Sequence, residues 1–231
     1  MSHWQPRGTV YGTLLNFQGE WAIWAPRMHA DPYKAPPQAP VLYVKSANTF
    51  NPAGQDLVLQ DGVSEVDIGA TLGLVMGAAG QVASVGLLCD WSVPHASYYR
   101  PPVKFRCRDG YLGLPQHTTA FGSSRHWAAL SIETRRNGER VQTLNLQNMV
   151  RPIDRLLADV GEFMTLQPGD VLMVGTDCLQ LDEQGGTGAA TGTRNTSGGD
   201  WKKNDIVTVT TQDFSINADI TNVTFAVAEP E

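Results

Sequence analysis

The chain has 231 residues, a formal net charge of −6 and a pI near 5.3. This length suits one large domain with a substantial core, so we expect a single domain over 1–231. The acidic balance argues against nucleic-acid binding, because a phosphate footprint needs a surplus of Lys and Arg on one face. The longest apolar runs fall far short of the ~20 residues of a membrane span, so no membrane partner is expected.

The cysteine pattern and the beginning of the chain favour a reducing compartment. Cys89, Cys107 and Cys178 lie far apart without a CxxC spacing, so neither a disulfide framework nor a zinc site is indicated. No basic segment followed by an apolar one opens the chain, as a secretory signal would require. We therefore expect a soluble, cytoplasmic protein.

The first half of the chain is predicted to be mainly strands. Four segments have the apolar pattern of strands: 9–15, Val41–Lys45, 69–77 and 87–90. Residues 17–29 carry Trp21 and Trp24 at a helical spacing, which predicts a short helix. The proline-rich stretch 31–40 predicts an extended connection. The polar stretch 50–68 predicts a hairpin-like passage.

The second half is predicted to contain a β-hairpin, a helix and closing strands. Residues 127–146 alternate on both sides of an Asn-Gly turn, which is typical of a hairpin. Apolar residues recur at helical spacing through 148–163 and predict an amphipathic helix of some four turns. Strands are expected at 171–174 and twice within 205–227. The Gly- and Ser-rich stretch 184–199 predicts a surface loop, and it lacks the Lys-Ser/Thr of a phosphate loop.

The stretch from Asp90 onwards holds most of the groups able to do chemistry. Asp90 closes an apolar run, so a rigid strand end would aim its carboxylate at the loop that follows. Cationic and phenolic residues fill that loop: His95, Tyr98, Tyr99, Arg100, Lys104, Arg106 and Arg108. This composition predicts a pocket for a small dianion. Arg106 and Lys104 are the first candidates for substrate contact, because the carboxylates of a diacid need fixed cations.

Seven short segments together carry a resemblance. They are Gly-Thr-Val-Tyr-Gly-Thr-Leu-Leu-Asn (8–16), Pro-Tyr-Lys-Ala-Pro-Pro (32–37), Val-Lys-Ser-Ala-Asn-Thr (44–49), the 69–77 strand, Ser-Tyr-Tyr-Arg-Pro-Pro (97–102), Cys-Arg-Asp-Gly (107–110) and Leu-Gln-Pro-Gly-Asp-Val-Leu-Met-Val-Gly-Thr (166–176). In this order they resemble the fumarylacetoacetate hydrolase family, most closely the amino-terminal half of the decarboxylase/isomerases of homoprotocatechuate (4-hydroxyphenylacetate) degradation.

The resemblance implies a mainly β (α+β) fold. In this family the chain forms a mixed β-sandwich roll with a few peripheral helices. Residues 1–50 would make the lid and N-terminal region, and 51–231 the catalytic-type β roll. The helical segment 17–29 would then lie over the pocket.

The resemblance also implies a Mg or Mn site, held by a Glu-x-Glu pair on one strand and an Asp at the end of a later one. Hard cations take oxygen ligands, and alternate strand residues project to one face. In this chain the two Glu positions fall on Gly69 and Thr71, and Asp90 alone keeps its carboxylate. One carboxylate is a poor cage for such an ion, so we expect no cofactor in this chain.

The family's other functional positions are altered too. Catalytic members carry a His and, three residues on, a Glu after the first strand, and these positions fall on Glu20 and Ile23. No catalytic residue is assigned; Glu20 and His95 are the candidates that remain. Thr176 matches a Thr that holds a substrate carboxylate in the family, where it would join Arg100, Lys104 and Arg106 in substrate binding. The Pro that follows that Thr is here Asp177.

Three functions are consistent with this sequence. The first is a subunit of a decarboxylase/isomerase for unsaturated 2-oxo or 2-hydroxy diacids, of the 2-hydroxyhepta-2,4-diene-1,7-dioate isomerase or 5-carboxymethyl-2-oxo-hex-3-ene-1,7-dioate decarboxylase type. It would have reduced or no activity alone and form a homodimer or pair with a metal-bearing paralogue. The second is an active isomerase or decarboxylase whose Asp90 holds a metal in a new geometry, with water or with Glu65, Asp67 or Glu20. The third is a non-catalytic dicarboxylate-binding or regulatory protein.

Overall fold

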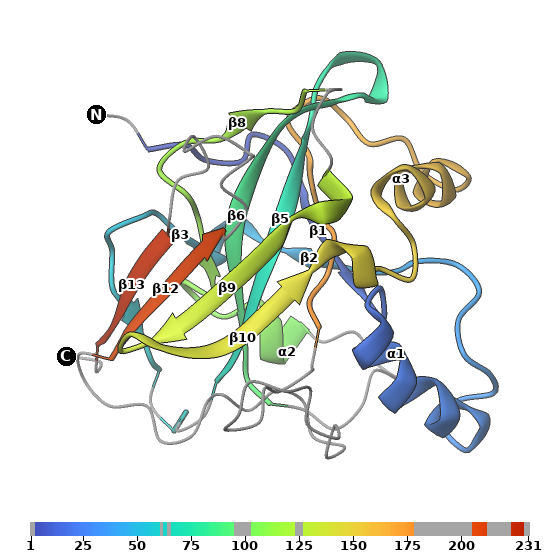
Figure 1. Cartoon of the computed structure of the whole chain (residues 1–231), viewed down its shortest axis with the longest axis horizontal. Helices are drawn as coiled ribbons and strands as arrows, with labels where there is room; N and C mark the ends of the chain where they lie inside the picture. Colours follow the sequence, from blue (N-terminus) through green and yellow to red (C-terminus); the bar gives the residue numbers. More distant parts are fainter. Residues whose placement is uncertain are drawn as a thin grey trace.

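The computed structural model describes residues 3–60, 62–63, 66–94, 103–122, 127–177, 205–211 and 223–228. Within these residues, strands predominate over helices and form two sheets (Figure 1). This arrangement confirms the mainly β, α+β class predicted from the sequence. The helices of the described residues are all too short to cross a membrane.

The larger sheet has eight strands in the described residues. Its spatial order is β2 (Val41–Lys45), β1 (Val10–Leu14), β11 (Val171–Met173), β5 (Asp67–Met76), β6 (Val82–Ser92), β7 (Leu112–Gly113) and β3 (Phe50–Asn51), and β8 (Thr119–Ala120) pairs with β6. β1 runs parallel to β11, whereas β11 with β5 and β5 with β6 are antiparallel. The sheet thus brings the beginning of the chain beside residues close to Val171.

The smaller sheet has five strands in the described residues. Its order is β10 (Glu139–Asn145), β9 (Ser131–Arg136), β12 (Ile206–Thr211), β13 (Val223–Ala228) and β4 (Leu57–Val58). β9 and β10 are joined by Asn137 and Gly138, whose φ angles are 52° and 85°. Positive φ at both central residues is the geometry that Asn-Gly favours in a two-residue hairpin turn. The predicted hairpin is therefore confirmed. Two strands were also expected within 205–227, and β12 and β13 confirm them where the structure describes this region, since 212–222 lie outside the described residues.

The long β5–β6 hairpin forms the centre of the molecule. Figure 1 shows the smaller sheet crossing it, and β9 and β12 contact it directly. Successive strand residues point to opposite faces. Leu87 belongs to the same apolar cluster as Ile132 and Val207 of the smaller sheet, whereas its neighbour Leu88 belongs to a second apolar cluster, with Trp24 and Val171. Because both faces of the hairpin are covered, its strands are almost continuously apolar.

Three helices lie at the periphery of these sheets within the described residues. They are α1 (Gln18–Trp24), which continues as a 3₁₀ turn over Ala25–His29, α2 (Val103–Arg106) and α3 (Ile153–Gly161). α1 confirms the helix predicted within 17–29. It buries Trp24 and leaves Trp21 partly exposed.

Some predicted elements differ from those found. The helix predicted over 148–163 begins only at Ile153, since Pro152 is its N-cap and a 3₁₀ turn occupies Leu146–Asn148. The hairpin predicted within 50–68 is wrong, because β3 pairs with β7 and β4 pairs with β13. The strand expected from residue 127 begins at Ser131 after a 3₁₀ turn. The loop predicted at 184–199 lies outside the described residues.

Candidate functional site

Asp90 lies two residues before the end of β6, opposite Gly69 in the register with β5. Asp90 shares the face of the sheet to which Leu88 points, toward the apolar cluster that includes Tyr43 and Leu112. Its side chain is fully buried. The prediction that Asp90 ends its strand is therefore wrong by two residues. Instead of facing an open loop, its carboxylate points into the interior of the protein.

Two cations and a phenol surround the Asp90 carboxylate. The Lys45 ammonium lies 2.8 Å from Oδ1, and an Arg106 guanidinium nitrogen lies 2.6 Å from Oδ2. The Tyr43 hydroxyl donates a hydrogen bond to Oδ2 and accepts one from Arg106 at 3.1 Å. We call these four residues the Asp90 cluster. It ties β2, β6 and α2 together, since each contributes at least one member.

Lys45 and Arg106 are both buried: the side chain of Lys45 is 0% exposed and that of Arg106 is 4% exposed. The Lys45 ammonium also donates hydrogen bonds to the backbone carbonyls of Trp91, at 3.2 Å, and Arg106. The Arg106 guanidinium lies over the Tyr43 ring, 4.5 Å from its centre. Both cations are thus held by partners inside the protein.

Burial and charge act in opposite directions on these groups. Burial by itself would raise the pKa of Asp90, but the Lys45 ammonium and the Arg106 guanidinium outweigh it and hold that pKa below its ordinary value. Burial lowers the pKa of Lys45, and the Asp90 carboxylate offsets only part of this effect. Asp90 is therefore ionised at neutral pH and compensated by cations of the same chain.

Gly69, the residue opposite Asp90 on β5, leaves no room for a longer side chain. A Cβ atom on Gly69 would lie 2.7 Å from the Thr176 methyl carbon and 2.8 Å from the backbone oxygen of Asp90. Thr71, two residues along the same face, donates its hydroxyl hydrogen to the backbone carbonyl of Gly175 at 2.7 Å. Thr176 and Gly175 thus fill the space in front of β5.

These side chains do not fit the Mg or Mn ion that the family resemblance implies. The Asp90 carboxylate already lies against two buried cations, Lys45 and Arg106, whose charges would repel a divalent ion bound to the same oxygens. Gly69 offers no oxygen in its side chain, and Thr71 uses its hydroxyl on a backbone carbonyl. Among the residues described, no group of three His, Cys, Asp or Glu side chains comes together.

A second polar cluster lies where α1 meets the end of β1. Leu15 has a φ of 59°, which is costly for a residue with a Cβ. Its backbone N–H donates to the Glu20 carboxylate at 2.7 Å, and the backbone N–H of Glu20 donates to Asp177 at 3.0 Å. Gln142 of β10 donates to the backbone carbonyl of Asp177 at 2.7 Å. Glu20 and Asp177 therefore fix the turn between β1 and α1.

The predicted site residues fall in different places. Arg106 belongs to the Asp90 cluster, and Thr176 lies against Gly69. Lys104 is exposed on α2. Glu20 belongs to the second cluster. His95 and Arg100 lie outside the described residues, as does Glu65.

Sequence reasoning missed Tyr43 and the depth at which Lys45 is buried. The signal was present in the strand Val41–Lys45, because its alternation places Tyr43 and Lys45 on the same face. Tyr43 also explains Gly12 on the neighbouring strand β1. A Cβ there would lie 2.0 Å from a carbon of the Tyr43 ring, so only Gly lets the ring cross β1 and reach Asp90.

The fold and the buried carboxylate define a β-roll protein built around one long hairpin. The chain belongs to the fumarylacetoacetate hydrolase family, because the family model "Fumarylacetoacetate (FAA) hydrolase C-terminal" matches residues 9–221. The chain is 32% identical over 190 residues to the 4-hydroxyphenylacetate degradation bifunctional isomerase/decarboxylase of Escherichia coli. The aligned part covers 78% of this chain and 43% of that protein. The chain thus spans less than half the length of this relative.

Other similarities are more distant. The chain is 27% identical over 157 residues to the mitochondrial oxaloacetate tautomerase Fahd2a of Rattus norvegicus, covering 61% of the chain and 49% of the relative. The crystal structure of fumarylpyruvate hydrolase from Pseudomonas aeruginosa, in complex with Mn²⁺ and pyruvate, matches with a TM-score of 0.69 at 16% identity, covering 96% of this chain and 90% of that one. The structure of 5-carboxymethyl-2-hydroxymuconate delta-isomerase from Mycobacterium smegmatis matches with a TM-score of 0.67 at 18% identity, covering 96% and 79%. At such identities the solved structures show the fold alone.

Proposed function

We propose that the chain is a subunit of a cytoplasmic decarboxylase/isomerase acting on unsaturated 2-oxo or 2-hydroxy diacids in aromatic catabolism, with a degenerate metal site of its own. The reaction class is supported by identities of 31–32% to three bifunctional isomerase/decarboxylases. The single observation that carries the degenerate site is the commitment of Asp90 to Lys45 and Arg106, opposite a Gly69 that has no room for a side chain.

In this proposal the Asp90 cluster has a structural role: it stabilises the packing of β2, β6 and α2. A buried charge is tolerated when it is paired and hydrogen-bonded, and Asp90 meets both conditions through its own chain. Lys45 and Arg106 are too deeply buried to meet a substrate carboxylate where they stand. We therefore expect turnover to depend on a partner, either a second copy or a paralogue that keeps the Glu-x-Glu pair.

Two measurements on the purified chain test this proposal. Calorimetric titration with Mg²⁺ and Mn²⁺ is expected to give no binding tighter than millimolar. An assay with the unsaturated 2-oxo diacid is expected to show little turnover by the chain alone and much more after a Glu-x-Glu paralogue is added. Turnover by the chain alone at ordinary enzymatic rates would refute the proposal.

A second candidate is a non-catalytic dicarboxylate-binding or regulatory protein. It is favoured by Lys104, an exposed cation two residues from the Asp90 cluster. This candidate predicts micromolar binding of a dicarboxylate with no turnover in any mixture. Replacing Lys104 by Gln should then weaken binding, whereas the subunit proposal predicts no effect on the activity of the assembled enzyme.

The third candidate, an active enzyme with a rearranged metal site, has less support. Asp67 lies opposite Ser92 on the hairpin, and Glu20 holds the backbone of Leu15. Within the described residues neither acid forms a metal-binding group with Asp90. Glu65, the remaining acid of that hypothesis, lies outside those residues. The same calorimetric titration tests this candidate, which requires binding tighter than millimolar.

A further inference from the structure

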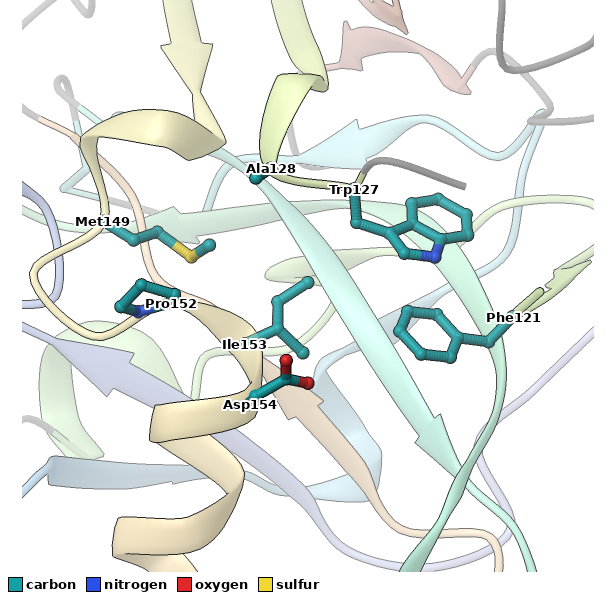
Figure 2. Close-up of a pocket in the computed structure, with 7 residues that line it drawn as sticks. All are labelled: Phe121, Trp127, Ala128, Met149, Pro152, Ile153 and Asp154. Atoms are coloured by element: carbon teal, nitrogen blue, oxygen red, sulfur yellow. The ribbon is translucent and has the colours of Figure 1, made fainter. Parts of the chain in front are cut away.

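A pocket of about 240 Å³ opens at the beginning of α3, and it shares no residue with the Asp90 cluster. Its lining comes from the segment after β8, the 3₁₀ turn before β9 and the start of α3. The lining residues are Phe121, Trp127, Ala128, Met149, Pro152, Ile153 and Asp154 (Figure 2).

One side of this pocket is aromatic and the other is aliphatic. The rings of Phe121 and Trp127 stack with their centres 5.1 Å apart and their planes 10° from parallel. Figure 2 shows Met149, Pro152 and Ile153 on the other side of the space that these rings border. Such a lining favours a flat apolar group, because an aromatic ring gains stacking energy beyond the area it buries.

Among the described residues that line this pocket, the charged one is Asp154, whose side chain is exposed in the first turn of α3. The two arginines near it are directed elsewhere. Arg151 and Arg155 both pair with Asp159, at 3.1 Å and 2.5 Å. Within the described residues, Asp154 therefore has no ion pair. An unpaired carboxylate beside an apolar pocket attracts a cation, and the net charge of −6 adds to that attraction.

We propose that this pocket binds a small arylalkylamine, with the aromatic ring against Phe121 and Trp127 and the ammonium group beside Asp154. A cavity of about 150 Å³ is enough for benzene, so this pocket has room for one ring and a short alkyl chain. Asp154 would repel a dicarboxylate, the ligand of the proposed function. The pocket is thus a second site, which prefers a cationic ligand where the proposed function requires an anionic one. This inference does not depend on the proposed function.

Phenethylamine and phenylacetate, which carry the same ring and opposite charges, test this proposal on the full chain. The Trp127 indole N–H signal, assigned by its loss in Trp127→Phe, is followed by NMR during each titration. Phenethylamine is expected to shift that signal with a Kd on the order of 1 mM. Phenylacetate is expected to bind at least about fivefold more weakly, because its charge is reversed.

Two variants locate the interaction. Asp154→Asn should weaken phenethylamine binding about threefold to fivefold, as expected for an exposed ion pair. The matched control is Glu162→Gln, which removes an exposed carboxylate at the opposite end of α3 and should change nothing. Phe121→Leu removes one stacked ring and should weaken binding about twofold to tenfold.

Three results would overturn the proposal. One is equal binding of phenylacetate and phenethylamine. Another is a titration in which other tryptophan signals shift and that of Trp127 does not. The third is an Asp154→Asn variant that binds phenethylamine as tightly as Glu162→Gln does, when both variants melt at the wild-type temperature.

Discussion

Asp90 is the residue on which the interior of the larger sheet depends most. Replacing it by Asn removes the anion between Lys45 and Arg106 and leaves two buried cations without compensation. We expect Asp90→Asn to lower the free energy of unfolding by about 3–5 kcal/mol, measured by urea denaturation. The control is Asp31→Asn at an exposed position, which should change it by less than about 0.5 kcal/mol. Equal stability of the two variants would contradict the structural role of the Asp90 cluster.

The same carboxylate should make stability depend on acid pH. The folded-state pKa of Asp90 lies below its ordinary value, so its contribution is fully present above the unfolded pKa of about 3.9 and is lost as the pH falls through the folded pKa. The difference in unfolding free energy between wild type and Asp90→Asn should therefore shrink as the pH falls below about 4. A difference in unfolding free energy that grows as the pH falls would contradict this prediction.

Gly69 should resist even the smallest substitution. A Cβ there would press on the Thr176 methyl and on the backbone oxygen of Asp90, so we expect Gly69→Ala to destabilise the protein by about 1–3 kcal/mol. Gly161→Ala, in α3, is the control, because a Cβ there meets nothing within 4 Å. That variant should be neutral or stabilising by up to about 1 kcal/mol. Thermal melts of both variants give the comparison.

Among single residues, the sequence identified Asp90, together with Gly69 and Thr71 on the neighbouring strand, because carboxylates and their absence are visible in a motif. It did not reveal which cations compensate Asp90. Lys45 lies 45 residues before Asp90 in the sequence and Arg106 lies 16 residues after it. Such pairing depends on how the fold places β2, β6 and α2 next to one another, and no local sequence pattern encodes that placement.

Among the elements, α1 is attached to the sheet through Glu20. Glu20→Ala would leave the buried N–H of Leu15 without its acceptor, at a cost of about 1–3 kcal/mol. Because Leu15 is held at a positive φ, the turn should relax and α1 should open more often. Hydrogen exchange is expected to accelerate in α1 and to stay unchanged in α3. Glu20→Gln keeps an acceptor oxygen and should show a smaller effect; uniform acceleration would contradict a local role.

Elements specified by local chemistry were predicted well. The β9–β10 hairpin is set by its Asn-Gly turn, and the buried β5 is set by a continuous apolar run. For β6 the prediction covered only 87–90, whereas the strand extends over Val82–Ser92. The prediction failed where pairing is long-range, since β3 and β4 join strands far away in sequence. It also overlooked Pro152, which cannot donate a backbone hydrogen bond and so delays the start of α3.

At the scale of the whole molecule, we expect the thermal stability of the protein not to depend on divalent metal. A ligand at 100 times its Kd stabilises the folded state by about 2.7 kcal/mol, or roughly 5–10 °C in melting temperature for a chain of this size. We expect millimolar Mg²⁺ or Mn²⁺, or removal of metal with EDTA, to shift the melting temperature by less than about 1 °C. A rise of several degrees with either ion would show that a metal site survives.

The parallel pairing of β1 with β11 also bears on biosynthesis. Val10 leaves the ribosome long before Val171, its partner in the sheet. At roughly 5–20 residues per second, the nascent strand waits on the order of ten seconds or more for that partner. During this interval the edge of β1 that β11 will cover is unpaired, so the unfinished chain is open to chaperones and to misassembly with its neighbours on the polysome.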